Sequence, residues 1–255
     1  MADGTLTLSF LVVLAVSSFA LPLVFLGWIR NTERLSREPW FAVLRSFAWG
    51  AVFSVLVAIL LSLLLLSLLL DVAPLTELLS TRFTDPQAIV AVLVVAPLVE
   101  EASKGLGVRS GRRHTDVRVD GLVYGAAAGL GFSATENLFY GLAIFAVEGP
   151  SASLVLIAFR SFSSSFLHAS ATAVTGYGLA KGWLTGRAGA FLPFYFAAVL
   201  MHATFNGFAS FGELYAQGVG EIAYAIGFAA AAAFAVGAIT VVRYKLASHR
   251  PHPPG

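Results

Sequence analysis

The chain has 255 residues, of which 58% are hydrophobic and only 12% are charged. A soluble globular domain carries about 25% charged residues, so this composition excludes an ordinary soluble fold and indicates a polytopic helical membrane protein. The chain has no cysteine, which excludes disulfides and thiolate chemistry, and its formal net charge is only +2.

Seven apolar segments are each long enough to cross a bilayer, which takes about 20 residues. The first is predicted to be an uncleaved span, because no basic residue precedes it as in a signal peptide. The third is interrupted by Pro97, which can kink a helix, and then by two glutamates. We therefore predict an all-α transmembrane bundle that forms one integral-membrane domain over residues 1–247, followed by a disordered cytoplasmic tail over 248–255. The predicted spans are 6–29, 41–70, 87–108, 120–147, 152–180, 189–211 and 222–243.

The loops between these spans alternate in charge. The loops after spans one, three and five and the C-terminal tail are basic, whereas the opposite loops carry only Arg82 among acidic residues. By the positive-inside rule, we predict that the N-terminus lies outside and the C-terminus lies in the cytoplasm. The predicted location is a bacterial-type inner or plasma membrane. Basic residues on that side orient the protein and meet anionic lipid, so they require no nucleic acid. They are Arg30, Arg34, Arg37, Arg45, Lys104, Arg109, Arg112, Arg113, Arg118, Lys181, Arg187, Arg243, Lys245 and Arg250.

Ionisable residues deep inside a span are confined to spans three to six. Because a charge in hydrocarbon is costly, each is a functional-site hypothesis. Helical spacing of three and four places them on inward-facing polar stripes, and their depths agree to within roughly 10 Å along the membrane normal. We therefore expect them to meet in one buried layer. With their neighbouring amides they are Glu100, Glu101, Lys104, Glu136, Asn137, Arg160, His168, His202 and Asn206.

Each of these groups also has a purely structural interpretation. Glu100 and Glu101 could be a boundary pair solvated from the cytoplasm, His168 could be satisfied by nearby hydroxyls, and Glu136 could form a buried ion pair with Arg160. Two adjacent carboxylates in a low dielectric cannot both ionise easily, however, so one should hold a proton. One group that takes a proton beside one that gives it suits general acid–base catalysis.

The motifs resemble those of a known family. Glu100-Glu101-Ala-Ser-Lys104 matches the Glu-Glu-x-x-Lys motif of the PrsW family of intramembrane proteases. The segment 120–137 resembles the second block of that family, and segments 168–178 and 202–206 resemble its later histidine blocks. The resemblance lies within a motif-bearing core at 87–211. It implies a multi-pass peptidase that cuts membrane-anchored protein substrates, anti-sigma factors in the best-known cases, and is related to CAAX-processing membrane proteases.

From these residues we expect Glu100 or Glu101, together with His168, to activate a water as general base. His202 and Asn206 would stabilise the oxyanion or hold a divalent metal. Lys104, Glu136, Asn137 and Arg160 would support them. If a metal such as zinc is used, its predicted ligands are Glu136, His168 and His202. The sequence favours a metal-free version, because no compact ligand motif such as His-x-x-x-His occurs.

Other functions remain open at this point. A proton-coupled transporter would also use intramembrane Glu, His and Arg, but it predicts polar stripes that continue to both faces. A non-catalytic scaffold would keep the packing glycines and tolerate Glu101→Gln. A rhomboid-like serine site at 131–134 rests on a weak tetrapeptide, and a two-histidine haem site would leave both glutamates unexplained.

Overall fold

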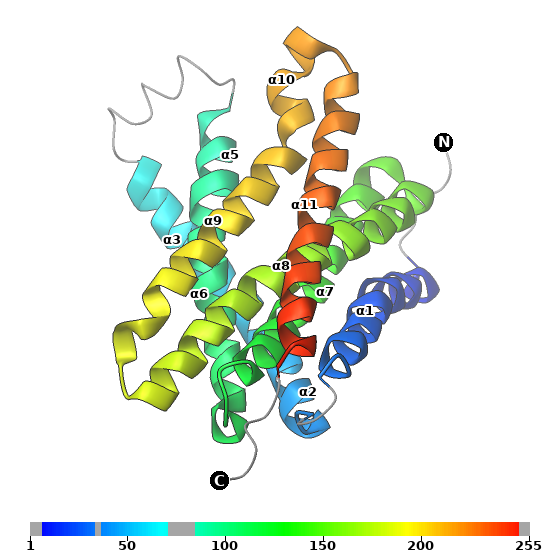
Figure 1. Ribbon diagram of the computed structural model, residues 1–255. Helices are drawn as coiled ribbons and strands as arrows, with labels where there is room; N and C mark the ends of the chain where they lie inside the picture. The colour runs from blue at the N-terminus through cyan, green and yellow to red at the C-terminus, as the bar shows by residue number, and fades with distance from the viewer. Residues whose placement is uncertain (1–6, 34–36, 71–84, 250–255) are drawn as a thin grey trace.

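The computed structural model describes residues 7–33, 37–70 and 85–249, and this part of the chain is helical without any strand. The predicted all-α bundle is therefore confirmed (Figure 1). The tail residues 250–255 and the loop residues 71–84, which include Arg82, lie outside the described residues, as does Arg34. The elements are α1 (Leu8–Arg30), α2 (Trp40–Trp49), η1 (Gly50–Ser54), α3 (Val55–Leu70), α5 (Pro86–Val90), η2 (Ala91–Val95), α6 (Ala96–Val108), η3 (Arg109–His114), α7 (Asp120–Glu148), α8 (Pro150–Thr185), η4 (Ala188–Phe191), α9 (Leu192–Ala209), α10 (Phe211–Val219) and α11 (Ile222–Ala247).

Within the described residues, six helical segments are long and apolar enough to cross a membrane. The chain is accordingly a multi-pass membrane protein. The remaining predicted span corresponds to the helix α5–η2–α6, which carries the glutamate pair and Lys104. Three spans run further than predicted, since α8 continues to Thr185, the sixth continues through α10, and α11 continues to Ala247.

Helices α7 and α8 form the centre of the bundle. Gly121, Gly125 and Gly129 lie on the face of α7 that meets α8, and a Cβ atom on any of them would overlap backbone carbonyls of α8. Such small-residue rows let two helices approach closely. The close contact places His168 of α8 opposite the polar stripe of α7, so this packing positions the site.

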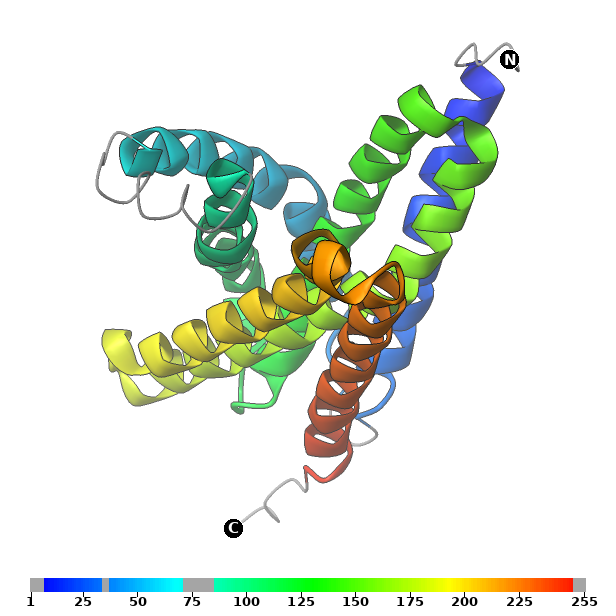
Figure 2. The same ribbon diagram turned by 90° about the horizontal axis from the view of Figure 1, so that it is seen from above.

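The other helices cover the two flanks of this pair. Helices α1 and α11 lie on one flank, and α3, α5, α6 and α9 lie on the other (Figures 1 and 2). On α7, Gly131 packs against the backbone of α2, and Gly50 of η1 packs against the backbone of Ala128. The junction between α2 and η1 is thereby held against α7 before the chain continues into α3.

The basic loops contact one another at one end of the molecule. Arg45 donates to the carbonyl oxygen of Ser110, and the Nε atom of Arg243 donates to Thr32 Oγ1 at 3.0 Å. The guanidinium of Arg112 lies 5.8 Å from the ring centre of Trp183. These contacts join the loops after spans one, three and five to the end of α11, as the charge pattern requires. The orientation in the bilayer stays a prediction.

Candidate active site

Lys104 is the central cation of the predicted polar layer. Its side chain is fully buried, and Nζ lies 2.6 Å from Glu101 Oε1 and 3.5 Å from Glu100 Oε2. Nζ also lies 2.9 Å from Nδ1 of His168 and 4.6 Å from the ring centre of Phe132. One ammonium group therefore connects both glutamates of α6 to the histidine of α8.

His168 is held from its other side by Glu136 of α7. Nε2 of His168 lies 2.9 Å from Glu136 Oε2, and the same oxygen lies 2.7 Å from an Arg160 guanidinium nitrogen. The Nε atom of Arg160 donates to Asn137 Oδ1 at 3.0 Å. Glu136 and Arg160 thus form the ion pair that the structural interpretation expected, and that pair also orients the imidazole of His168.

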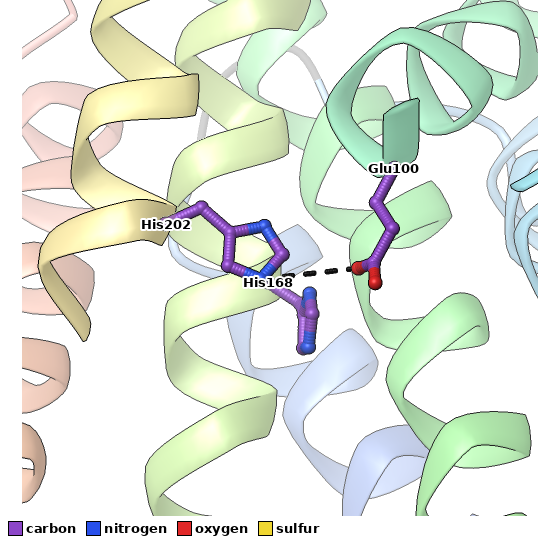
Figure 3. Close-up of side chains that lie close together, drawn as sticks. All are labelled: Glu100, His168 and His202. Carbon is purple, nitrogen blue, oxygen red and sulfur yellow. Dashed lines mark ion pairs between the residues drawn. The ribbon is translucent and has the colours of Figure 1, made fainter. Parts of the chain in front are cut away.

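His202 of α9 approaches from the opposite side. Its Nδ1 lies 3.0 Å from Glu101 Oε1, and Thr172 donates its hydroxyl to Glu101 Oε2 at 3.0 Å. Because a carboxylate accepts, Nδ1 carries the hydrogen, and Nε2 is left as the atom that faces Glu100, 3.8 Å from Oε2. The rings of His168 and His202 are 4.9 Å apart, and both lie near the Glu100 side chain (Figure 3).

Glu100, His168 and His202 form a group that fits a metal ion. Among the described residues, each offers one ligand atom, and these atoms lie within 4.8 Å of one another. A carboxylate with two imidazoles is a usual donor set for zinc. The hydrogen bond that His202 Nδ1 donates to Glu101 is also the kind of outer contact that orients a metal-binding histidine. This group differs from the predicted ligand set in having Glu100 in place of Glu136.

The structure does not bring every predicted residue to this cluster. Asn206, predicted to face an oxyanion or a metal, instead donates its amide to the carbonyl oxygen of Val92 at 2.8 Å. It therefore attaches α9 to η2. Asn137 contacts the cluster only through Arg160.

Two hydroxyl groups were not among the predicted site residues. Thr172 bonds Glu101, and Tyr195 of α9 donates to the carbonyl oxygen of Leu98 at 2.7 Å. Thr172 is four residues after His168, and Tyr195 is seven before His202. Helical spacing does place both hydroxyls on the polar stripes of the two histidines, although it does not identify them as site residues.

The two adjacent glutamates differ in exposure. The side chains of Glu101 and Lys104 have no exposed surface, whereas that of Glu100 is 13% exposed and that of Glu136 is 21% exposed. Access to the cluster from outside the bundle therefore leads first to Glu100 and Glu136, with the Glu101–Lys104 pair behind them.

Two comparisons with known proteins give a match. The family model described as PrsW family intramembrane metalloprotease matches residues 38–242. "Protease PrsW" of Clostridioides difficile (strain 630) is 29% identical over 192 residues, which cover 74% of this chain and 74% of that protein. No solved structure gives a significant match.

Proposed function

Because the chain belongs to the PrsW family of intramembrane metalloproteases, we propose that it hydrolyses a peptide bond of a membrane-anchored protein at the Glu100–His168–His202 cluster. The observation that carries the proposal is the meeting of carboxylates, imidazoles and one ammonium from α6, α8 and α9 in a single buried site. A substrate of the anti-sigma-factor type is the one that the family resemblance suggests. The family assignment favours this peptidase over the transporter and scaffold alternatives.

In the metal-free version, Glu100 is the general base. It is the member of the pair that reaches the surface, so a water and a scissile peptide can approach it. Glu100 takes a proton as the water oxygen bonds to the carbonyl carbon, and it returns the proton to the leaving nitrogen as the carbon–nitrogen bond breaks. The Lys104 ammonium, which is held by Glu101, supplies positive charge near the developing oxyanion.

A divalent cation also fits the donor atoms. Glu100, His168 and His202 would hold it, and when bound it would supply Lewis-acid polarisation of the scissile carbonyl. Glu101 would then orient His202 through Nδ1. His168 would have to release one of its two present partners, Lys104 at Nδ1 or Glu136 at Nε2, to offer the cation a nitrogen. The family description supports this version. Sequence spacing gives no sign of such a site, because its three donors come from three different helices.

The decisive experiment uses the purified protein in vesicles with a membrane-tethered test substrate. We expect Glu100→Gln, Glu101→Gln, His168→Ala and His202→Ala each to lower cleavage by at least about 100-fold, while Glu148→Gln at an exposed position serves as the control. Full cleavage by both Glu100→Gln and Glu101→Gln would remove the catalytic assignment.

Metal content separates the two versions. If a cation is bound, wild-type protein should contain about one equivalent of zinc, His202→Ala should contain much less, and a chelator should abolish cleavage until zinc is restored. Undiminished cleavage by metal-free protein would support the version in which Glu100 is the base.

A further inference from the structure

An apolar groove leads from the surface of the bundle to the candidate active site. It is a cavity of about 360 Å³ between α3 on one side and the helix α5–η2–α6 on the other, with α7 as its floor. Among the described residues, its polar lining consists of Ser62, Glu100 and Glu136. Several apolar lining side chains, including Ile59 and Leu63, are more than one third exposed. The groove is therefore open on the outer surface of a membrane-embedded bundle.

The polar end of the groove is the exposed part of the site. Glu100 and Glu136 are the two acids of the cluster with exposed side-chain surface, and both line this cavity. A soluble polar peptide would lose its hydration in such an apolar channel without gaining partners. A hydrophobic transmembrane segment meets no such cost, because it exchanges lipid contacts for contacts with aliphatic side chains.

One wall of the groove contains a π-helical turn, and a second π-helical turn lies directly before the other wall. η1 immediately precedes α3, and η2 supplies the lining residues Ala91, Val92 and Val95. Single π turns inside helices are frequent at functional sites. The η2 wall is attached to α9 by the bond from Asn206 to Val92, and η1 is packed on α7 through Gly50. The groove thus lies between two supported walls.

We propose that this groove is the docking site for the membrane-spanning segment of the substrate and delivers the scissile peptide to Glu100. The inference rests on the proposed function and adds the chemical class of the substrate. A peptide carbonyl inside a regular helix is already hydrogen-bonded along the chain. Segments with Gly or Pro near the cut position open most easily, so an apolar span with such a break is the preferred substrate.

Photo-crosslinking tests the docking site without requiring cleavage. A photoreactive residue is placed at Leu63 in the groove or at Leu64, which is 57% exposed and does not line it, in the Glu101→Gln protein. The probe is a Leu- and Ala-rich spanning peptide of about 20 residues with a central Gly-Pro step, in phosphatidylcholine vesicles. We expect about tenfold more crosslinking at Leu63, equivalent to roughly 1.4 kcal/mol of preference over bulk lipid. Excess unlabelled peptide should remove only the Leu63 signal.

A second pair of variants tests the groove by filling it. Ala91→Trp should lower the Leu63 crosslink about tenfold, or roughly 1.4 kcal/mol, whereas Val94→Trp, at an exposed neighbouring position outside the groove, should not. Equal crosslinking at positions 63 and 64 would overturn the docking site, and cleavage by wild-type protein would then leave the proposed function standing. Groove-specific crosslinking without any wild-type cleavage would overturn the proposed function and keep the docking site.

Discussion

At the scale of single residues, the adjacent glutamates occupy different environments. Glu101 is fully buried and contacts Lys104, Thr172 and His202, whereas Glu100 is partly exposed and lines the groove. Removing one partner of a buried ion pair leaves the other charge uncompensated, which costs far more than changing an exposed group. The two positions should therefore respond differently to the same substitution.

We expect Glu101→Gln to decrease the free energy of unfolding by about 3 kcal/mol, the lower end of the usual range for a broken buried ion pair, because Glu100 at 3.5 Å still compensates part of the Lys104 charge. Glu100→Gln should leave the unfolding temperature nearly unchanged but lower hydrolysis about 100- to 10,000-fold. Thermal unfolding in detergent and initial cleavage rates measure both effects. An equal loss of stability in the two variants would contradict this division of roles.

A second group of acids lies between α1 and α2, outside the spans. Glu33 and Glu38 are buried, Tyr124 donates its hydroxyl to Glu38, and neither carboxylate oxygen of Glu33 has a partner among the described residues. Burial, with Asp120 adding to it, raises the pKa of Glu33 to about 7. Burial also raises the pKa of Glu38 to about 8, against the lowering effect of the Tyr124 hydrogen bond.

These raised pKa values predict a pH-dependent stability. An acid whose pKa is higher in the folded state contributes stability that is complete below its unfolded value near 4.5 and is lost as pH rises through about 7 and 8. The unfolding temperature should therefore fall between about pH 5 and pH 8, and Glu38→Gln should flatten the slope. Glu148→Gln, at an exposed position, should keep the wild-type slope. An unchanged slope in Glu38→Gln would be the contrary result.

At the scale of helices, the contact of α7 with α8 determines the geometry of the site. Gly129 packs against the carbonyl of His168, so one added methyl group would push apart the two helices that carry Glu136 and His168. The same helices hold the ion pair with Arg160. The active-site distances therefore depend on the absence of a side chain at this glycine.

We expect Gly129→Ala to lower both the unfolding temperature and activity, although alanine favours a helix by about 0.5–1 kcal/mol over glycine. Gly237→Ala in α11, where no atom lies within 4 Å of the added Cβ, is the matched control and should be neutral or slightly stabilising. Thermal unfolding and cleavage assays on both proteins compare them. Wild-type behaviour of Gly129→Ala would show that the two helices can separate without disturbing the site.

At the scale of the whole molecule, the charge pattern of the sequence and the fold both place the basic loops at the same end of the bundle. The basic loops lie together at one end, and the Leu8 end of α1 and the Ala247 end of α11 lie at opposite ends of the bundle (Figures 1 and 2). An odd number of crossings separates the termini in this way. The family match over residues 38–242 covers the helices that carry the site and the flanking ones other than α1, up to the last turn of α11.

The predicted orientation can be tested by labelling, because the chain has no cysteine of its own. Glu148→Cys, beside the short turn between α7 and α8, should react with an impermeant maleimide on intact cells. Arg187→Cys, between α8 and η4, should react only after permeabilisation. The reverse pattern would place the basic loops outside the cell.

The amino-acid sequence by itself determined the all-α membrane bundle, the polar layer of spans three to six and the family. These follow from local physics, since hydrocarbon excludes charges and helical spacing places residues on one face. The tertiary structure decided which groups meet: Lys104 with His168, Glu100 rather than Glu136 beside His202, and Asn206 with Val92. It also created the groove between α3 and α5–α6. The rotation and tilt of each helix decide which way its polar stripe faces. Contacts between helices, such as those of the α7 glycines with α8, set this rotation and tilt, so the sequence of a single helix does not contain that information.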